Sequence, residues 1–156
     1  MLQAYPVNLT KDEEGYIVQF SDVPEALTVG SDIENALQWA QDALVVALSG
    51  YMNDKRDIPK PSKPVKNQYT VALPPLAASK LAIYQAMRDN HISQAELAEK
   101  LNCDAKQVRR LLDLDHNSTL EQLASALKAL DKELIVDIAE RKLKKSTHKQ
   151  SEAYAR

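Results

Sequence analysis

The sequence predicts an α+β protein in which an N-terminal antiparallel sheet with one packed helix is joined to a C-terminal all-α domain. Three observations predict this fold class. Short runs typical of strands dominate the first 30 positions, helical periodicity dominates positions 76–131, and a segment with three prolines separates the two regions. With 156 residues, the chain can form two small domains, whose modest cores are often supported by oligomerisation.

Three short strands are expected near the N-terminus, at 2–9, 16–20 and 26–30. Tyr16, Val18 and Phe20 share one face of the second strand because side chains alternate along a strand. Polar runs at 11–15 and 21–25 supply the turns. The sequence therefore predicts a three-stranded meander.

An amphipathic helix follows the third strand. Ser31 or Asp32 can cap its N-terminus, with Glu34 in its first turn. Its apolar stripe is expected to cover the sheet and consists of Ile33, Ala36, Leu37, Ala40, Ala43, Leu44, Ala47 and Leu48. Gly50 is expected to end the helix.

Residues 53–67 form a semi-rigid connection, because prolines at 59, 61 and 64 forbid a regular helix or a central strand. Residues 68–73 are strand-like and can return to the sheet before Pro74 and Pro75 end them. The expected domains are 1–74, which includes this connection, 75–139, which is helical, and a flexible basic tail at 140–156.

Four helices are expected in the second domain, at 76–90, 93–101, 104–113 and 119–131. The segment 133–139 is rich in β-forming residues and is expected to form an exposed edge strand. That strand would join two copies of the chain through Leu134, Ile135, Val136 and Ile138.

The second and third of these helices carry the pattern of a helix-turn-helix of the phage-repressor type. Ser93 and Glu96 form an expected capping box, Asn102 suits a left-handed turn, and Asp104 caps the next helix. Val108 and Leu111 are expected to face inward. This geometry places the N-terminal end of the second helix in the major groove of double-stranded DNA, and such proteins bind as dimers.

The side chains left exposed on that helix suit DNA recognition. Arg pairs with guanine, Gln pairs with adenine, and Lys reaches guanine or phosphate. Gln94, on the preceding helix, is placed to bond the phosphate backbone. The expected DNA-binding set is Gln94, Ala105, Lys106, Gln107, Arg109 and Arg110.

Charge is divided unequally along the chain, whose formal net charge is −2. Residues 1–58 hold three Lys or Arg against ten Asp or Glu, a balance of −7, whereas residues 59–156 carry a balance of +5. This asymmetry indicates an acidic module for a basic partner and a basic module for a polyanion.

The run AYPVNLTKDEEGYIVQFSDVPEALTVGSDIENALQWAQDALVVAL resembles the N-terminal domain of HicB-type antitoxins. The stretches IPKPS, VALPPLAASKLAIYQAM and RRLLDLDHNSTLEQLASALKALDKELIV resemble the variants that carry a helix-turn-helix. Two positions depart from the family pattern: Ser21 replaces a usual proline, and Glu25-Ala26 replaces a common Gly-Cys. Both departures could alter the surface that binds a partner.

The resemblance implies a partial RNase H-like fold for the first domain, which would hold and occlude a small basic toxin of the HicA type. That toxin is an RNA-cleaving enzyme with a double-stranded-RNA-binding-like fold. The resemblance also implies that the second domain represses the toxin–antitoxin operon. Acidic residues in the loops are the expected toxin contacts, namely Asp12, Glu13, Glu14, Asp22 and Glu25.

Two other functions remain open at this point. A nuclease would need converging carboxylates, and Asp12, Asp22, Glu25 and Asp32 lie in turns and at a helix cap instead, so no enzyme activity is expected. A ligand-sensing transcriptional repressor without a toxin partner is the stronger alternative. It predicts an apolar ligand pocket in the first domain.

Several classes of site are not expected. The single Cys103 excludes an internal disulfide framework, and His91, His116 and His148 lack partners at metal-ligand spacing, so no cofactor is expected. Trp39 and Tyr51 are alternatives for a partner interface, although Trp39 is equally compatible with the core. Without a membrane span or a secretory signal, the expected location is the cytoplasm.

Overall fold

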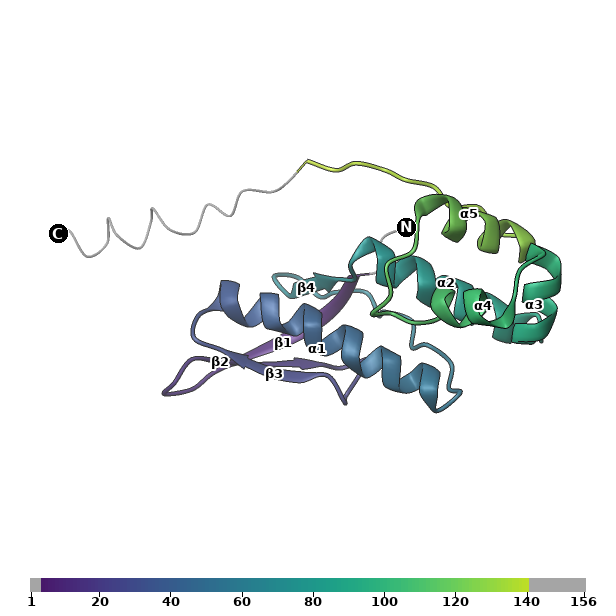
Figure 1. The fold of residues 1–156 in the computed structure, drawn as a ribbon. Helices are drawn as coiled ribbons and strands as arrows, with labels where there is room; N and C mark the ends of the chain where they lie inside the picture. Colours follow the sequence, from purple (N-terminus) through teal and green to yellow (C-terminus); the bar gives the residue numbers. More distant parts are fainter. Residues whose placement is uncertain (1–3, 141–156) are drawn as a thin grey trace.

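The structure, a computed structural model, describes residues 4–140 and is a mixed α+β fold. Within these residues it has one four-stranded antiparallel sheet and five α-helices. The elements are β1 (Ala4–Lys11), β2 (Tyr16–Phe20), β3 (Leu27–Gly30), α1 (Ile33–Asn53), β4 (Tyr69–Ala72), α2 (Pro75–Asp89), α3 (Gln94–Leu101), α4 (Ala105–Leu111) and α5 (Leu120–Ala129). Figure 1 shows α1 lying along the sheet and the four later helices gathered beside this layer.

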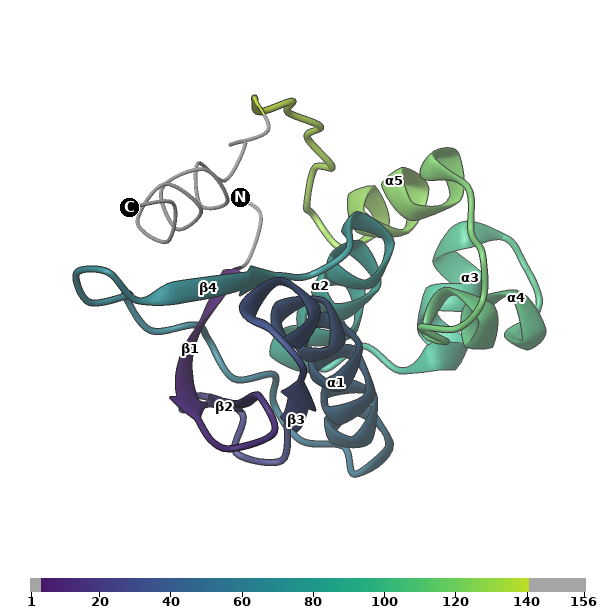
Figure 2. The same cartoon turned by 90° about the vertical axis from the view of Figure 1, so that its left-hand side faces the viewer.

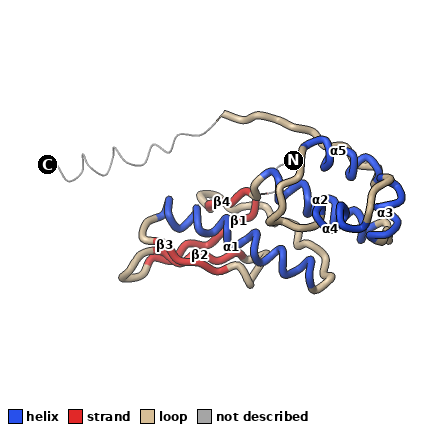
Figure 3. Tube along the Cα trace, viewed as in Figure 1, coloured by secondary structure: helices blue, strands red, loops and turns tan. Residues whose placement is uncertain are grey.

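The sheet has the strand order β3-β2-β1-β4. The first three strands form the predicted meander, with Val7 opposite Phe20 and Ile17 opposite Val29. The strand-like run after the proline-rich connection returns to the sheet as β4 and pairs with β1, with Tyr5 opposite Val71. Figure 3 shows the strands in red, and β1 and β2 are the two central strands of the sheet.

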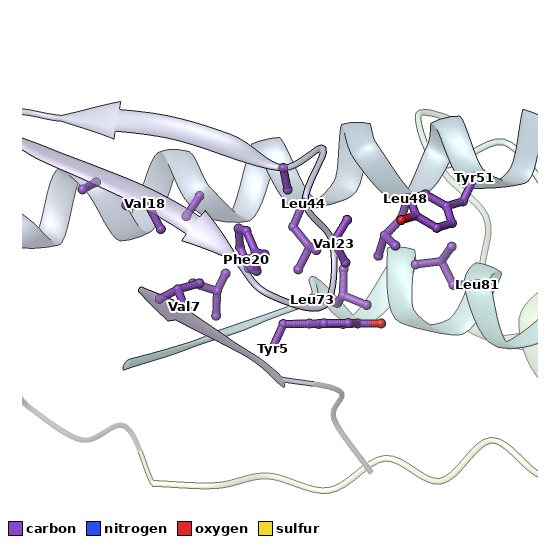
Figure 4. Close-up of a cluster of buried hydrophobic side chains, with 14 residues drawn as sticks. Tyr5, Val7, Val18, Phe20, Val23, Leu44, Leu48, Tyr51, Leu73 and Leu81 are labelled. Atoms are coloured by element: carbon purple, nitrogen blue, oxygen red, sulfur yellow. The ribbon is translucent and has the colours of Figure 1, made fainter. Parts of the chain in front are cut away.

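The core of the first domain lies between the sheet and α1. Alternation along β1 and β2 directs Tyr5, Val7, Val18 and Phe20 to one face, where all four are buried. They meet the predicted helical stripe, of which Ala36, Ala40, Leu44 and Leu48 are fully buried. Figure 4 shows these large side chains interleaved between the layers. The helix and the sheet are therefore held by burial of one apolar face on each.

The close approach of α1 to β3 requires Gly30. A Cβ atom at this position would lie 2.4 Å from the Cα and backbone N of Ala36. Ala36 is itself fully buried, so neither side of the contact has room for a larger group. The glycine that ends β3 thus sets how close the helix comes to the sheet.

Helix α1 begins as predicted and ends later than predicted. Asp32 caps it and accepts a hydrogen bond from the backbone N–H of Asn35. Gly50 does not end the helix, because the next turn carries Tyr51, which is buried in the core. The backbone N–H of Asp54 donates to the carbonyl of Gly50, so the glycine lies inside the last turn.

The proline-rich connection is bonded to both parts of the molecule. The hydroxyl of Tyr5 donates to the carbonyl of Pro59 over 2.6 Å, and the backbone N–H and hydroxyl of Ser62 donate to Asp22. The backbone N–H of Ile58 donates to the side chain of Gln85 on α2. Prolines deny this segment its own regular structure, and the bonds to its neighbours hold it in place.

Helix α2 packs against two hydrophobic cores. Pro75 occupies its first turn, where a missing N–H costs nothing. Leu81 belongs to the core of the sheet domain, as Figure 4 shows, whereas Ile83, Ala86 and Met87 belong to the core of the helical domain. Figure 2 shows α2 between α1 and the remaining helices.

No helix within residues 4–140 is long and apolar enough to span a bilayer.

The predicted strand at 133–139 is absent from the structure. The segment has no regular structure: Leu134 packs partly against the helical core, while Ile135, Val136 and Ile138 are 77%, 65% and 87% exposed. Strand structure needs backbone bonds to a neighbour, and none of the described residues pairs with this segment. The predicted basic tail lies outside the described residues from position 141 onward.

We predict that Tyr5 makes stability fall at alkaline pH. Burial and the nearby charge of Asp22 raise the pKa of the Tyr5 phenol from 10.0 to about 12. Folding favours the neutral form of the Tyr5 phenol. The contribution of this side chain to the free energy of unfolding is therefore fully present below pH 10 and is lost as the pH rises through 12. Urea unfolding at a series of pH values should show the advantage of wild type over Tyr5→Phe shrinking by about 2–3 kcal/mol across this window.

The tyrosinate absorbance supplies the matched measurement. Tyr5→Phe should reduce the late-titrating absorbance by the amplitude of one tyrosine. Because the pKa values of Tyr51 and Tyr84 are also raised, part of the late component should remain in Tyr5→Phe. A late component of unchanged amplitude in Tyr5→Phe would contradict the assignment.

Candidate nucleic-acid interface

The turn between α3 and α4 fixes the relative direction of these two short helices. Asn102 adopts the predicted left-handed conformation, with φ 50° and ψ 48°. Its short polar side chain tolerates this region better than most residues do. The next residue, Cys103, donates its backbone N–H to the carbonyl of Ala98. The turn thereby closes the end of α3 and leads directly into α4.

Side-chain caps define where the helices of this region begin. Ser93 and Asp104 accept hydrogen bonds from the backbone N–H groups of Glu96 and Gln107, as the sequence predicts. Only half of the predicted capping box forms at α3, because the carboxylate of Glu96 accepts from the Ser93 hydroxyl at 3.2 Å. A complete box occurs instead at α5, between Thr119 and Gln122.

The inward faces of α3 and α4 pack on the helical core. Leu97 and Val108 are fully buried, and Leu111 is 6% exposed, as the spacing predicts. Leu123 and Leu127 of α5 complete the contact. Burial on this side leaves the opposite side of α4 facing solvent.

The structure brings the six predicted DNA-binding residues to the surface. All are exposed, including Gln94 at the first position of α3. With 3.6 residues per turn and Val108 and Leu111 facing inward, Lys106 lies near the centre of the outward face, between Arg109 and Arg110. The exposed side of α4 is therefore a compact group of three cations.

A groove of about 520 Å³ runs between α4 and the start of α5. Gln107 and Arg110 line one wall, and the polar segment His116–Asn117–Ser118 lines the other. This groove was not predicted from the sequence, in which His116 was noted only for lacking partners at metal-ligand spacing. The polar run before the cap at Thr119 is the signal that could have indicated it.

Lys80 is a site residue that the sequence analysis missed. Its side chain is fully buried, and its ammonium donates to the carbonyls of Arg110, Asp113 and His116 at 2.6–2.7 Å. Burial lowers the pKa of Lys80, and the negative charge of Asp113 opposes this effect. Lysine within an amphipathic helix usually indicates a solvated position, so only the folded chain shows its role.

The five acidic residues expected to contact a toxin do not form one patch. Asp12, Glu13 and Glu14 lie in the β1–β2 turn, whereas Asp22 and Glu25 lie in the β2–β3 loop. These loops are at opposite ends of β2, because the strands run antiparallel. Glu13 and Glu14 are exposed, and Asp12 accepts backbone bonds from its own turn.

The two acidic residues of the β2–β3 loop are already bonded within the chain. Asp22 accepts from Ser62, and Glu25 accepts from the Tyr51 hydroxyl at 2.8 Å and from Arg56 at 3.2 Å. The hydrogen bond from Tyr51 is the main cause that lowers the pKa of Glu25, with Arg56 adding to it. The guanidinium of Arg56 lies 3.9 Å from the centre of the Tyr51 ring.

The carboxylates considered for a nuclease are held apart in the same way. Asp32 caps α1 and Asp12 closes the β1–β2 turn, while Asp22 and Glu25 bond to residues at the far end of β2. Among residues 4–140, no three metal-ligating side chains come together. The four carboxylates therefore have separate structural contacts and share no common site.

The aromatic, cysteine and histidine residues noted in the sequence differ in how exposed they are. Trp39 is 53% exposed on α1, whereas Tyr51 is buried and its hydroxyl is engaged by Glu25. Cys103 is half-buried against the helical core, and His91 is exposed between α2 and α3. His148 lies outside the described residues.

Comparison with known proteins identifies the family. A family model described as the HicB-like antitoxin of bacterial toxin–antitoxin systems matches residues 4–82, which span the sheet, α1 and the first half of α2. The chain is 42% identical over 130 residues to Antitoxin HicB 2 of Photorhabdus laumondii, covering 83% of this chain and 92% of the relative. It is 38% identical over 131 residues to Antitoxin HicB of Escherichia coli K12, covering 83% and 95%. The chain belongs to the HicB-like antitoxin family.

Proposed function

We propose that this antitoxin neutralises a small basic RNA-cleaving toxin of the HicA type and represses its own operon by binding operator DNA. The observation that carries the DNA-binding half is the exposed cationic face of α4, on a helix that a left-handed turn connects to α3. The family membership carries the toxin-binding half. Neither half requires a catalytic group.

In this proposal, α3 and α4 act as a helix-turn-helix of the phage-repressor type. Helix α4 enters the major groove, where Arg109 and Arg110 can pair with guanine and Gln107 with adenine. Lys106 supplies a base or phosphate contact, and Gln94 bonds the phosphate backbone from α3. Ala105, at the start of α4, allows the helix to approach the bases closely.

The outer face of the sheet is the proposed contact surface for the toxin. This face points away from α1, and its side chains on β1, β2 and β3 carry no charge: Asn8, Thr10, Ile17, Gln19, Leu27 and Val29. Leu27 and Val29 are 55% and 64% exposed. An uncharged, partly apolar face suits a protein partner better than it suits solvent.

Acidic groups rim this face at its two ends. Asp12, Glu13 and Glu14 lie at one end, with Asp22 and Glu25 at the other. Since Asp22 and Glu25 are bonded within the chain, Glu13 and Glu14 are the freer partners for a basic toxin. Such charges raise the association rate more than the affinity.

Dimerisation through 133–139 is also proposed. A single chain leaves Ile135, Val136 and Ile138 exposed beside the half-buried Leu134. Pairing with the same segment of a second copy would supply the missing backbone partners and cover these side chains. Two recognition helices would then face adjacent half-sites.

Co-expression tests the antitoxin role. The protein should restore growth to cells that express the short basic protein encoded beside it, and Val29→Lys should abolish the rescue by placing a charge in the proposed contact. Val46→Lys is the matched control, because Val46 is 72% exposed on α1. Wild type that neither binds nor rescues would instead favour a ligand-sensing repressor.

Salt-dependent DNA binding tests the assignments on α4. With a duplex from directly upstream of the coding sequence, a base-reading Arg replaced by Ala should weaken binding by about 1–3 kcal/mol and relax specificity at one position. A lost phosphate contact, expected for Lys106→Ala, should lower the salt slope by about 0.9. Lys128→Ala, in the last turn of α5, is the control and should change neither.

Analytical ultracentrifugation tests the dimer segment. Val136→Pro should convert a dimer into a monomer, because proline removes a backbone donor and disrupts the paired strand. Val136→Thr keeps the N–H and the β-branched shape, so it should remain dimeric. If Val136→Pro has the same oligomeric state as wild type, the dimer interface does not include residues 133–139.

A further inference from the structure

The segment that follows the DNA-reading helix is held from two directions. On one side, the buried ammonium of Lys80 bonds to the carbonyls of Arg110, Asp113 and His116. On the other side, Leu114 packs against the core of the sheet domain. The end of α4 and the loop after it therefore lie between α2 and the first domain.

The three bonds of Lys80 are directional. An ammonium has three donors, and here each one points at a different carbonyl within seven residues of chain. The carbonyl of Arg110 belongs to the C-terminal end of α4, where a positive charge is favoured by the helix dipole. Neither of the two ion pairs within residues 4–140 involves Lys80, so carbonyl oxygens are its polar partners.

A lysine at position 80 can fix the position of the bonded backbone groups, which an apolar side chain could not do. Apolar contacts tolerate sliding, whereas three short hydrogen bonds specify the position and direction of the groups they join. Lys80 is also next to Leu81, whose side chain lies in the core of the sheet domain. The C-terminal end of α4 is thus tied to a helix that is anchored in the other domain.

We propose that Lys80, together with Leu114, is a positioning residue for DNA recognition, which sets the orientation of α4 relative to the sheet domain. This inference rests on the proposed DNA binding by α4. Lys80 is buried and does not itself reach DNA, so it acts through the backbone of residues 110–116.

Small tilts of α4 matter because hydrogen bonds to bases are short-ranged. Seven helical residues span roughly 10 Å, so a tilt of about 10° around one end displaces the other end by roughly 2 Å. Such a shift exceeds the distance range of a hydrogen bond. Contacts with the phosphate charges are less sensitive, since Coulomb energy falls slowly with distance. Loss of the Lys80 bonds should therefore reduce specific binding more than non-specific binding.

The test compares Lys80→Met with a variant that loses buried volume in the sheet core and keeps the Lys80 hydrogen bonds. Leu44→Ala removes buried volume from the sheet core, which contains no residue of α4. Binding of each full-length variant is measured on the duplex from directly upstream of the coding sequence and on a scrambled duplex of equal length. Circular dichroism sets a temperature at which all variants are folded.

Lys80→Met should lose about tenfold in affinity for the upstream duplex, with its affinity for the scrambled duplex within about twofold of wild type. Leu44→Ala should retain the wild-type ratio of the two affinities. Leu114→Ala keeps the hydrogen bonds of Lys80 and loosens the packing of the loop on the sheet core. It should also lower the ratio of the affinity for the upstream duplex to that for the scrambled duplex. This variant tests the proposal if Lys80→Met does not fold.

Two results would overturn the positioning role. One is an unchanged affinity ratio in Lys80→Met and Leu114→Ala, and the other is an equal loss in Leu44→Ala. The proposed DNA-binding function fails separately, when wild type itself shows no preference for the upstream duplex.

Discussion

The buried ammonium of Lys80 links the two halves of the molecule. Removing a charge from water is costly, and three carbonyls of residues 110–116 replace the lost hydration. Because Lys80 and Leu81 are neighbours on α2, one turn of helix belongs to the helical domain and to the core of the sheet domain at once. The position of α4, and with it the cationic surface, depends on this arrangement.

The proline-rich connection also joins the two parts of the molecule. It cannot form a helix or a central strand, yet Tyr5, Asp22 and Gln85 each bond to it. Arg88 of α2 also bonds Asp57 at 2.7 Å, and this interaction is the main cause that lowers the pKa of Asp57. The two domains are thus joined by a segment that contacts both, in addition to α2. A boundary at residue 74 separates two regions of different composition, but hydrogen bonds and apolar contacts cross it.

The family model matches the part of the chain that contains the sheet, and the curated relatives match 83% of the chain. The matched segment 4–82 contains the whole sheet, α1, the connection and Leu81, so it ends within the helix that joins the domains. Helices α3 and α4 lie beyond it. An uncharged outer sheet face and a cationic α4 face are consistent with two macromolecular partners of different chemistry, and the asymmetry of charge along the chain points the same way.

The sequence alone determined the elements whose signals are local. Alternation predicted β1–β3, apolar spacing predicted α1 and the four later helices, and cap residues such as Asp32, Ser93 and Asp104 marked where helices start. The left-handed turn at Asn102 and the exposure of the six α4 and α3 residues followed from the same reasoning. Only the tertiary structure decided the end of α1 beyond Gly50, the bonds of Asp22 and Glu25 within the chain, the absence of a strand at 133–139 within one chain, and the burial of Lys80. Each of these depends on contacts between segments distant in sequence, which composition and periodicity do not encode.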